Sequence, residues 1–332
     1  MLPKTLRGRL LLSLLIGLAV LIGLMLYADL PKMVHALGEF EWRYLPAILA
    51  LVLYNYALRF VKWHFYLGQI GVTAISRRDS LLIFLSGLSM TVTPGRVGEW
   101  LKSYFLTETT STPFSRSAPI IIAERLTDAL SMVLIACTGL FLFGFGQPLP
   151  FGKGWPIVVS VLALAAGVVA VVWFHPFARR ALALAERLPL LSRRVGPIRQ
   201  FYQSSHILLS PKNLLLATAL GVVSWTGEAV AFYLVLLGLG LEGSGLLVVQ
   251  ALFIYASASL AGIVFLTPGG LGVAEGGIIG LCQALLNMAR EGAAAATLLI
   301  RLSTLWFGVA VGVGALVLIT RRLGVTPEPS QT

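Results

Sequence analysis

Eight charged residues stand inside long apolar stretches of this sequence. They are Arg96, Glu99, Glu124, Arg125, Asp128, Glu228, Glu275 and Arg301. At the centre of a membrane-spanning helix, each charge would cost roughly 2.5–3.5 kcal/mol on insertion scales. Such residues therefore need partners of opposite charge or a polar cavity, and in membrane proteins they mark pathways for ions, protons or substrates.

The charges follow two related motifs. The first is Thr93-Pro94-Gly95-Arg96-Val97-Gly98-Glu99, and the second is Thr267-Pro268-Gly269-Gly270-Leu271-Gly272-Val273-Ala274-Glu275. In each case an arginine, Arg125 or Arg301, follows the glutamate by 26 residues and begins a similar triplet. Recurrence in the same order indicates an internal duplication. The equal spacing predicts the ion pairs Glu99–Arg125 and Glu275–Arg301, because a helix that follows a hairpin returns alongside it.

These motifs also suit the binding of an anion. Pro removes a backbone donor and Gly loosens the chain, so each Thr-Pro-Gly predicts a helix break. We expect the amides of turns 93–97 and 267–272 to point partial positive charge into a cavity. Arg96 has no arginine counterpart in the second motif, where Gly270 stands, so it is a surplus cation unless Glu124 or Asp128 pairs with it.

The predicted substrate-binding residues come from both motifs and from the segment after the first. They are Thr93, Gly95, Arg96, Glu99, Glu124, Arg125, Asp128, Thr267, Gly269, Gly270, Glu275 and Arg301. The alternative is that the pairs are only structural salt bridges that lock each hairpin to the following helix.

The elements that hold these residues are predicted to be membrane helices. Of the 332 residues, 57% are hydrophobic and 12% charged, against about 45–50% and 25% in soluble proteins. The apolar blocks are near the roughly 20 residues that a helix needs to cross a bilayer. The prediction is an all-α polytopic membrane protein with six crossing helices and two re-entrant helical hairpins. The crossing helices are 8–28, 44–66, 118–143, 155–174, 213–240 and 293–319, and the hairpins are 80–106 and 246–286.

The distribution of basic residues predicts the orientation. If both hairpins are re-entrant, eighteen Lys and Arg residues, among them Arg59, Lys62 and Lys102, fall on one side and four on the other. The positive-inside rule then places both termini in the cytoplasm. In this topology residues 44–143 and 213–319 form two repeats of inverted orientation, within one integral membrane domain covering residues 1–325.

The remaining segments are interpreted more simply. The leading helix 8–28 is expected to be a retained signal anchor, with a cleaved signal peptide as the alternative. The basic loop 175–212 either lies on an anionic lipid surface or only sets topology. The tail 326–332 is expected to be disordered. Trp63 and Trp225, near predicted span ends, are interpreted as interfacial anchors.

Several function classes are disfavoured. The net charge of +11 is attributed to topology rather than to nucleic-acid binding. Cys137 and Cys282 lie in apolar segments without metal-ligand spacing, so we expect no disulfide and no metal. The glycine-rich second motif is not a nucleotide-binding loop. We therefore expect no cofactor and no soluble catalytic domain.

Three parts of the sequence together resemble the lysylphosphatidylglycerol synthase transmembrane-region family, also called the flippase-like domain family. They are the first motif with its following lysine, the run Glu124-Arg125-Leu126-Thr127-Asp128, and the second motif. The resemblance covers about residues 8–320. Members include the flippase half of the bacterial multiple peptide resistance factor, which moves aminoacylated phosphatidylglycerol, and stand-alone proteins linked to hopanoid or polyprenyl-phosphate lipids. The aminoacyl-transferase domain of the resistance factor has no counterpart here, so the resemblance does not imply synthase activity.

The resulting hypothesis is a flippase of the cell inner membrane, not an enzyme. An anionic or aminoacylated phospholipid or a polyprenyl-phosphate-type lipid would place its headgroup between the hairpins, with protonation of Glu99 or Glu275 driving the cycle. One alternative is a membrane-embedded transferase or hydrolase that uses Glu124, Asp128 or Glu228 on a lipid-linked substrate. Another is a scaffold for lipid biosynthesis. Assembly into a homo-oligomer is left open.

Overall fold

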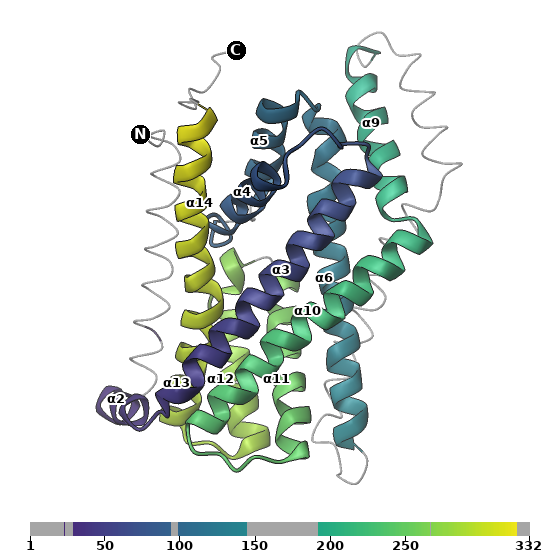
Figure 1. The fold of residues 1–332 in the computed structure, drawn as a ribbon. Coiled ribbons are helices and arrows are strands. Elements are labelled where there is room, and N and C mark those ends of the chain that lie inside the picture. The colour runs from purple at the N-terminus through teal and green to yellow at the C-terminus, as the bar shows by residue number, and fades with distance from the viewer. Residues whose placement is uncertain (1–22, 24–28, 94–98, 145–191, 266, 324–332) are drawn as a thin grey trace.

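The computed structural model describes residue 23 and residues 29–93, 99–144, 192–265 and 267–323. These residues form helices and short connections, with no strand among them (Figure 1), which confirms the all-helical prediction for this part of the chain. Several predicted features lie wholly or partly outside it: the helix 8–28 apart from residue 23, the helix 155–174, residues 175–191 of the loop 175–212, the tail 326–332, and two predicted site residues, Gly95 and Arg96.

The helices follow one another with short connections. In chain order they are α2 (Leu30–Gly38), η1 (Trp42–Tyr44), α3 (Leu45–Gln69), α4 (Arg77–Leu88), α5 (Leu101–Thr110), α6 (Phe114–Gly144), α9 (Ser192–Leu208), α10 (Pro211–Gly238), α11 (Gly245–Val264), η3 (Pro268–Gly270), α12 (Val273–Leu286), α13 (Arg290–Arg301), η4 (Leu302–Trp306) and α14 (Phe307–Leu323). The η4 segment is one turn of π-helix inside an otherwise continuous helix.

Four described segments are long and apolar enough to cross a membrane: Trp42–Gln69, Pro211–Gly238, Gly245–Val264 and Arg290–Leu323. Three of them correspond to the predicted crossing helices 44–66, 213–240 and 293–319. The predicted helix 118–143 lies within the 31-residue α6. The protein is therefore a helical membrane protein with several apolar helices.

Each Thr-Pro-Gly motif lies between two α-helices. In the first half α4 ends at Leu88 and α5 begins at Leu101. Its arms, α4 and α5, have 12 and 10 residues, about 18 and 15 Å at 1.5 Å per residue, too short for a hydrocarbon core of about 30 Å. In the second half α12 is also short, but α11 has 20 residues and is long enough to cross alone. The two predicted hairpins thus have unequal arms.

Corresponding helices of the two halves run in opposite directions. The crossing of α3 and α10 shows this directly (Figure 1). Near its middle, Asn55 Nδ2 donates to the Ser224 carbonyl over 3.1 Å, and Ser224 Oγ donates to the Asn55 carbonyl over 3.2 Å. At the far end of α3, Asn213 from the start of α10 donates to Gln69 over 3.1 Å. The start of α10 therefore meets the end of α3.

The halves also interlock, because each hairpin packs on the closing helix of the other half. Along α14, α4 runs antiparallel: Arg322 Nε lies 3.1 Å from Asp79 Oδ1, and Gly312 meets Ser89 further along. Likewise α11 packs on α6, where Gly139 lies against Phe253.

At the centre, the end of the first arm meets the second motif. A Cβ on Gly269 would lie 3.5 Å from the Val92 Cα. The residue just before the first Thr-Pro-Gly motif and the turn of the second motif therefore lie together where the two halves meet.

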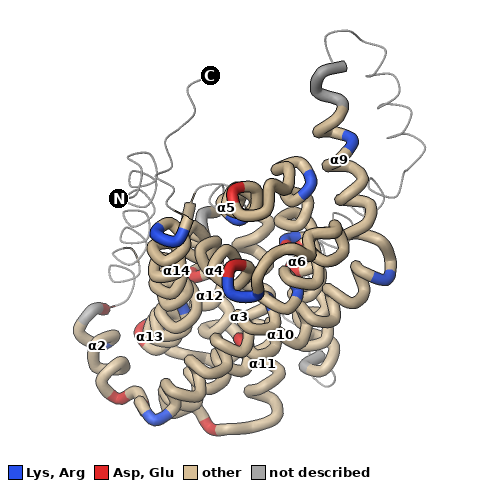
Figure 2. The backbone as a smooth tube through the Cα atoms, turned by 45° about the horizontal axis from the view of Figure 1, so that its top comes forward, with Lys and Arg blue, Asp and Glu red and all other residues tan. Residues whose placement is uncertain are grey.

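Two apolar clusters occupy opposite ends of the bundle. One contains Met33, Phe232 and Ile254 and joins α2, α10, α11, α12 and α13 with the later half of α6. The other contains Trp63, Phe84 and Phe105 and joins the end of α3 with α4, α5, the first half of α6 and the end of α14. Between them lies a polar layer on the middle turns of the long helices. Figure 2 accordingly shows charged residues within the bundle as well as at helix ends.

The close approach of α14 to α4 should depend on the lack of a side chain at Gly312. A Cβ there would overlap the Ser89 backbone nitrogen, so Gly312→Leu is expected to destabilise the protein by about 1–3 kcal/mol, as overpacking does. The measurement is the midpoint of thermal unfolding in detergent. Gly314→Ala is the matched control, since a Cβ there meets nothing within 4 Å. Equal stability of Gly312→Leu and Gly314→Ala would contradict this packing.

Candidate functional site

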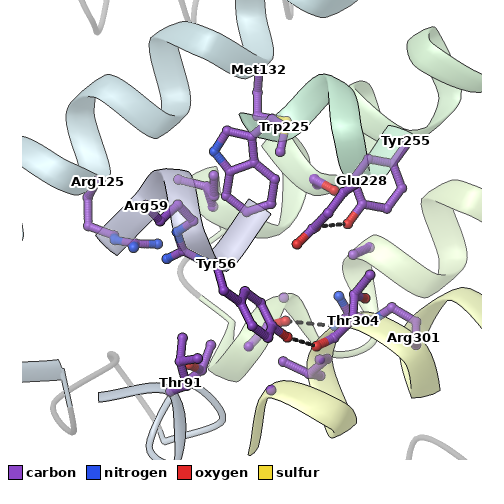
Figure 3. A pocket seen from close by; sticks show the side chains of 18 residues that line it. Tyr56, Arg59, Thr91, Arg125, Met132, Trp225, Glu228, Tyr255, Arg301 and Thr304 are labelled. Carbon is purple, nitrogen blue, oxygen red and sulfur yellow. Dashed lines mark hydrogen bonds between the residues drawn. The ribbon is translucent and has the colours of Figure 1, made fainter. Parts of the chain in front are cut away.

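A small cavity lies in the polar layer, where the two halves meet (Figure 3). It encloses about 90 Å³, far less than the 300–1,000 Å³ of drug-sized pockets. That space suits several waters or one phosphate-sized group, and it does not suit acyl chains. The first half contributes Tyr56, Arg59, Thr91 and Arg125 to the wall, and the second half contributes Trp225, Glu228, Tyr255, Gly269, Gly270 and Arg301.

In the first half, the predicted pair Glu99–Arg125 is present. Arg125 Nε lies 3.2 Å from Glu99 Oε2, and Arg125 Nη2 lies 3.1 Å from Asp128 Oδ2. Arg125 lines the cavity, whereas both carboxylates are buried behind it. The arginine thus presents one face to the cavity while two acidic side chains hold it.

In the second half, the predicted pair Glu275–Arg301 is also present, with Arg301 Nε 2.6 Å from Glu275 Oε1. The other carboxylate oxygen accepts the Gly272 amide over 2.6 Å and so caps the start of α12. Arg301 Nη2 donates to the Gly269 carbonyl over 2.7 Å. The pair therefore fixes both the turn after the second motif and the position of Arg301.

In the second turn, the amides of Gly270 and Gly272 do not point into the cavity as predicted, while most of the first turn lies outside the described residues. The Gly270 amide donates to the Thr267 carbonyl over 3.0 Å, and the Gly272 amide is taken by Glu275. These donors are therefore satisfied by the turn itself. The Thr267 Oγ1 atom is buried without a hydrogen-bond partner among the described residues, while Thr93 Oγ1 donates to the Met90 carbonyl over 2.7 Å. The backbone at Gly269 and Gly270 has φ of 61° and 75°, a conformation that favours glycine.

Two lysines that the sequence had placed at the cytoplasmic surface are buried in this layer. Lys62 Nζ lies 2.5 Å from Asp128 Oδ1, and Lys102 forms an ion pair with Glu124. Glu124 and Asp128 are therefore already paired within the described residues. The interpretation of Lys62 and Lys102 as topology signals is wrong, because neither reaches the surface. Without these two and Arg59, fifteen of the eighteen basic residues on that side remain against four, so the charge bias persists.

Arg59 lines the cavity but was not among the site residues predicted from the sequence. Its side chain, 15% exposed, lines the cavity, with Cζ 5.2 Å above the Trp225 ring. Its nearest carboxylate oxygen in an ion pair is Asp128 Oδ2, at 4.0 Å. Since Lys62 and Arg125 lie closer to Asp128, Arg59 is the most weakly paired of these three cations. Trp225 faces the cavity, and Trp63 is buried under Lys102, so neither tryptophan is an interfacial anchor.

A signal for Arg59 and Lys62 exists in the sequence. Asn55, Arg59, Lys62 and Tyr66 recur at spacings of four, three and four, which places them on one face of a helix. A polar stripe along an otherwise apolar crossing helix predicts that this face turns toward the interior of the bundle, as it does here.

Ten charged residues form what we call the central charged layer. The cations are Arg59, Lys62, Lys102, Arg125 and Arg301, and the carboxylates are Glu99, Glu124, Asp128, Glu228 and Glu275. Among the described residues the two charges are thus equal in number. No group of three His, Cys, Asp or Glu side chains in the described segments is arranged to hold a metal ion.

Comparison with known proteins identifies the family of this chain. The model of the family described as the lysylphosphatidylglycerol synthase TM region matches residues 14–312. The chain belongs to this family. The resemblance noted from the motifs is therefore confirmed, and the matched range includes every described residue of the central charged layer.

Two relatives match this chain almost from end to end, and a third matches over about half of its own length. A UPF0104 membrane protein of Methanothermobacter thermautotrophicus is 23% identical over 91% of this chain and 93% of its own length. UPF0104 membrane protein PH1989 of Pyrococcus horikoshii is 23% identical over 95% of this chain and 98% of its own. Glycosyltransferase AglD of Haloferax volcanii is 23% identical over 96% of this chain but only 55% of its own length. That protein therefore contains a further region of comparable size.

The Glu275–Arg301 pair gives a direct test of the layer. Arg301→Gln leaves a buried carboxylate without its cation and should destabilise the protein by about 3–5 kcal/mol, as for other broken buried pairs. The double variant Glu275→Gln/Arg301→Gln should recover part of that loss. Thermal unfolding in detergent measures both. Asp29→Asn/Lys32→Gln, at an exposed pair, is the control and should change little. If the double variant lost as much stability as Glu275→Gln and Arg301→Gln lose together, the two side chains would not interact.

Proposed function

We propose that this protein is a flippase that moves a lipid with an anionic phosphate headgroup across the cytoplasmic membrane. The observation that carries the proposal is the convergence of Arg59, Arg125 and Arg301, from both halves of the chain, on one cavity in the middle of the bundle. Guanidinium groups bind phosphate by charge-assisted, paired hydrogen bonds. Membership in the lysylphosphatidylglycerol synthase TM-region family supports a lipid rather than a soluble anion as the cargo.

Arg59 is the residue best suited to make first contact with the headgroup. Lys62 and Arg125 lie closer to Asp128 than Arg59 does. Arg59 therefore loses little ion-pair energy when its side chain turns toward a phosphate. Arg125 and Arg301 are held by carboxylates and a backbone carbonyl. They would form fixed, positively charged parts of the cavity wall. The small cavity would receive the headgroup phosphate while the lipid tails stay in the bilayer.

The hairpins supply the means of alternating access. We infer that α4–α5 and α11–α12 reach the midplane from opposite faces and meet at Val92 and Gly269. Transporters built from inverted repeats bind substrate at the repeat interface and open toward each side in turn. In this scheme both termini are cytoplasmic. The cargo class includes phospholipids, aminoacylated phospholipids and polyprenyl phosphates, which share the phosphate.

The alternative is a membrane-embedded transferase or hydrolase acting on a lipid-linked substrate. One relative carries the name of a glycosyltransferase, yet this chain matches only about half of that protein. Of the carboxylates considered for acid–base work, Glu124 and Asp128 form ion pairs with buried lysines, which favours a structural role for both. Purified protein that converts a lipid-linked substrate into a covalently altered product would support the enzyme instead.

The topology of the hairpins can be tested by cysteine labelling. In a background with Cys137→Ala and Cys282→Ala, Thr73→Cys and Glu108→Cys should react with an impermeant maleimide only from the cytoplasmic side. Glu242→Cys and Ala289→Cys should react only from the opposite side. All four positions are exposed. Labelling of positions 73 and 108 from different sides would mean that the first hairpin crosses the membrane.

Loss of the cavity charge at Arg59 should slow lipid movement. In proteoliposomes with a fluorescent phosphatidylglycerol, Arg59→Gln should reduce the protein-dependent flip rate roughly ten- to hundredfold, the equivalent of a hydrogen bond to a charged group of about 1.5–3 kcal/mol. Arg59→Lys should keep part of the rate because it keeps the charge. Arg43→Gln, at an exposed arginine, is the control. A wild-type rate for well-inserted Arg59→Gln would refute the role of this cavity.

A further inference from the structure

Glu228 is the one carboxylate of the central charged layer that has no ion pair in the described structure. Its side chain is 3% exposed and lines the cavity. Its hydrogen bond comes from the Tyr255 hydroxyl, a neutral donor (Figure 3). The other four carboxylates each lie within ion-pair distance of a Lys or Arg. Because no cation forms an ion pair with it, Glu228 is the carboxylate of this layer that gives up its charge most easily.

The groups that face Glu228 come from each element packed around the cavity. Helix α3 supplies Tyr56 and Arg59, α6 supplies Arg125 and Asp128, α11 supplies Tyr255, and α13 supplies Arg301. Arg59 and Arg301 line the same cavity as Glu228, yet neither forms an ion pair with it in the described structure. An anion entering this space would therefore compete directly with Glu228 for the same two arginines.

The protonation state of Glu228 decides the net charge of the described layer. With Glu228 ionised, the five described cations balance the five carboxylates. With Glu228 protonated, the described residues of the layer carry one positive charge more than negative, which matches a phosphodiester with a single negative charge. An uncompensated charge in a low-dielectric bundle is costly. Binding of the lipid anion and protonation of Glu228 should therefore favour each other.

We propose that Glu228 is a proton-binding site that takes up one proton when the anionic headgroup enters the cavity, so that lipid and proton cross together without net charge; this rests on the lipid movement proposed above. The proton comes from water and forms the neutral carboxylic acid, and it returns to water when the headgroup leaves. The Tyr255 hydroxyl can donate to Glu228 in either form. Glu99 and Glu275, the proton carriers expected from sequence, are instead held by Arg125 and Arg301.

The first experiment measures proton uptake on binding, without transport. Dioctanoyl phosphatidylglycerol is titrated into the detergent-solubilised protein by calorimetry in two buffers of different ionisation enthalpy. Wild-type protein should take up about one proton per lipid bound, and Glu228→Gln, which is isosteric and permanently neutral, should bind the lipid with almost no uptake. Glu228→Asp should restore the uptake. Glu242→Gln, at an exposed glutamate outside the layer, should behave as wild type.

The second experiment measures the use of a gradient. In proteoliposomes a pH gradient should drive fluorescent phosphatidylglycerol into one leaflet, whereas a membrane potential alone should not, because no net charge crosses. Glu228→Gln should still equilibrate the probe between leaflets but should lose the pH-driven asymmetry.

The outcomes separate the two proposals. Wild-type flipping with no proton uptake, or undiminished uptake in Glu228→Gln, would overturn the proton site and leave the flippase intact. Proton uptake on binding without any flipping would leave the proton site standing and contradict the proposed transport. Wild-type protein that neither binds nor moves phosphatidylglycerol would contradict both.

Discussion

The contact between Lys62 and Asp128 joins α3 to α6 at a depth where neither charge reaches the surface. Burying either charge alone would be prohibitive, so each must find the other as the helices pack. The same requirement applies to Lys102 with Glu124 and to Arg301 with Glu275. The Lys62–Asp128 pair connects helices that are distant in sequence, whereas each of the other two pairs connects consecutive helices. Charge neutrality in the middle of the bundle thus helps to fix which helices meet and at what height.

The helix breaks are subject to a related constraint. A backbone that leaves helical geometry inside a membrane must satisfy its own polar groups. The second turn does so locally, because the Gly270 and Gly272 amides and the Gly269 carbonyl all have partners, and two of those three partners are the members of the Glu275–Arg301 pair. That ion pair therefore neutralises charge and supports an irregular turn at once. It explains why the glutamate, the glycines and the arginine occur together in the motif.

Much of this arrangement could be predicted from the sequence. Apolar blocks placed α3, α6, α10 and the α13–α14 helix within a few residues, since length and hydropathy decide a crossing helix. The 26-residue spacing gave both arginine–glutamate pairs, because a hairpin arm and the next helix are neighbours in the chain. Lys62 and Asp128 could not be paired that way, since 66 residues and two helices separate them. Arg59 was likewise counted as a surface charge, because a net charge count ignores which face of a helix a residue occupies.

The interlocking of the halves bears on how such a site can work. Because α4 packs on α14 and α11 packs on α6, neither hairpin can shift without moving the closing helix of the other half. Arg301 ends α13 just before the turn that leads into α14, and Arg125 lies on α6, so a displacement of either hairpin also repositions an arginine of the cavity. The π-helical turn after Arg301 gives that helix a natural place to adjust, as π-turns often do at functional sites. Access to the cavity and the position of its charges are therefore coupled through the packing itself.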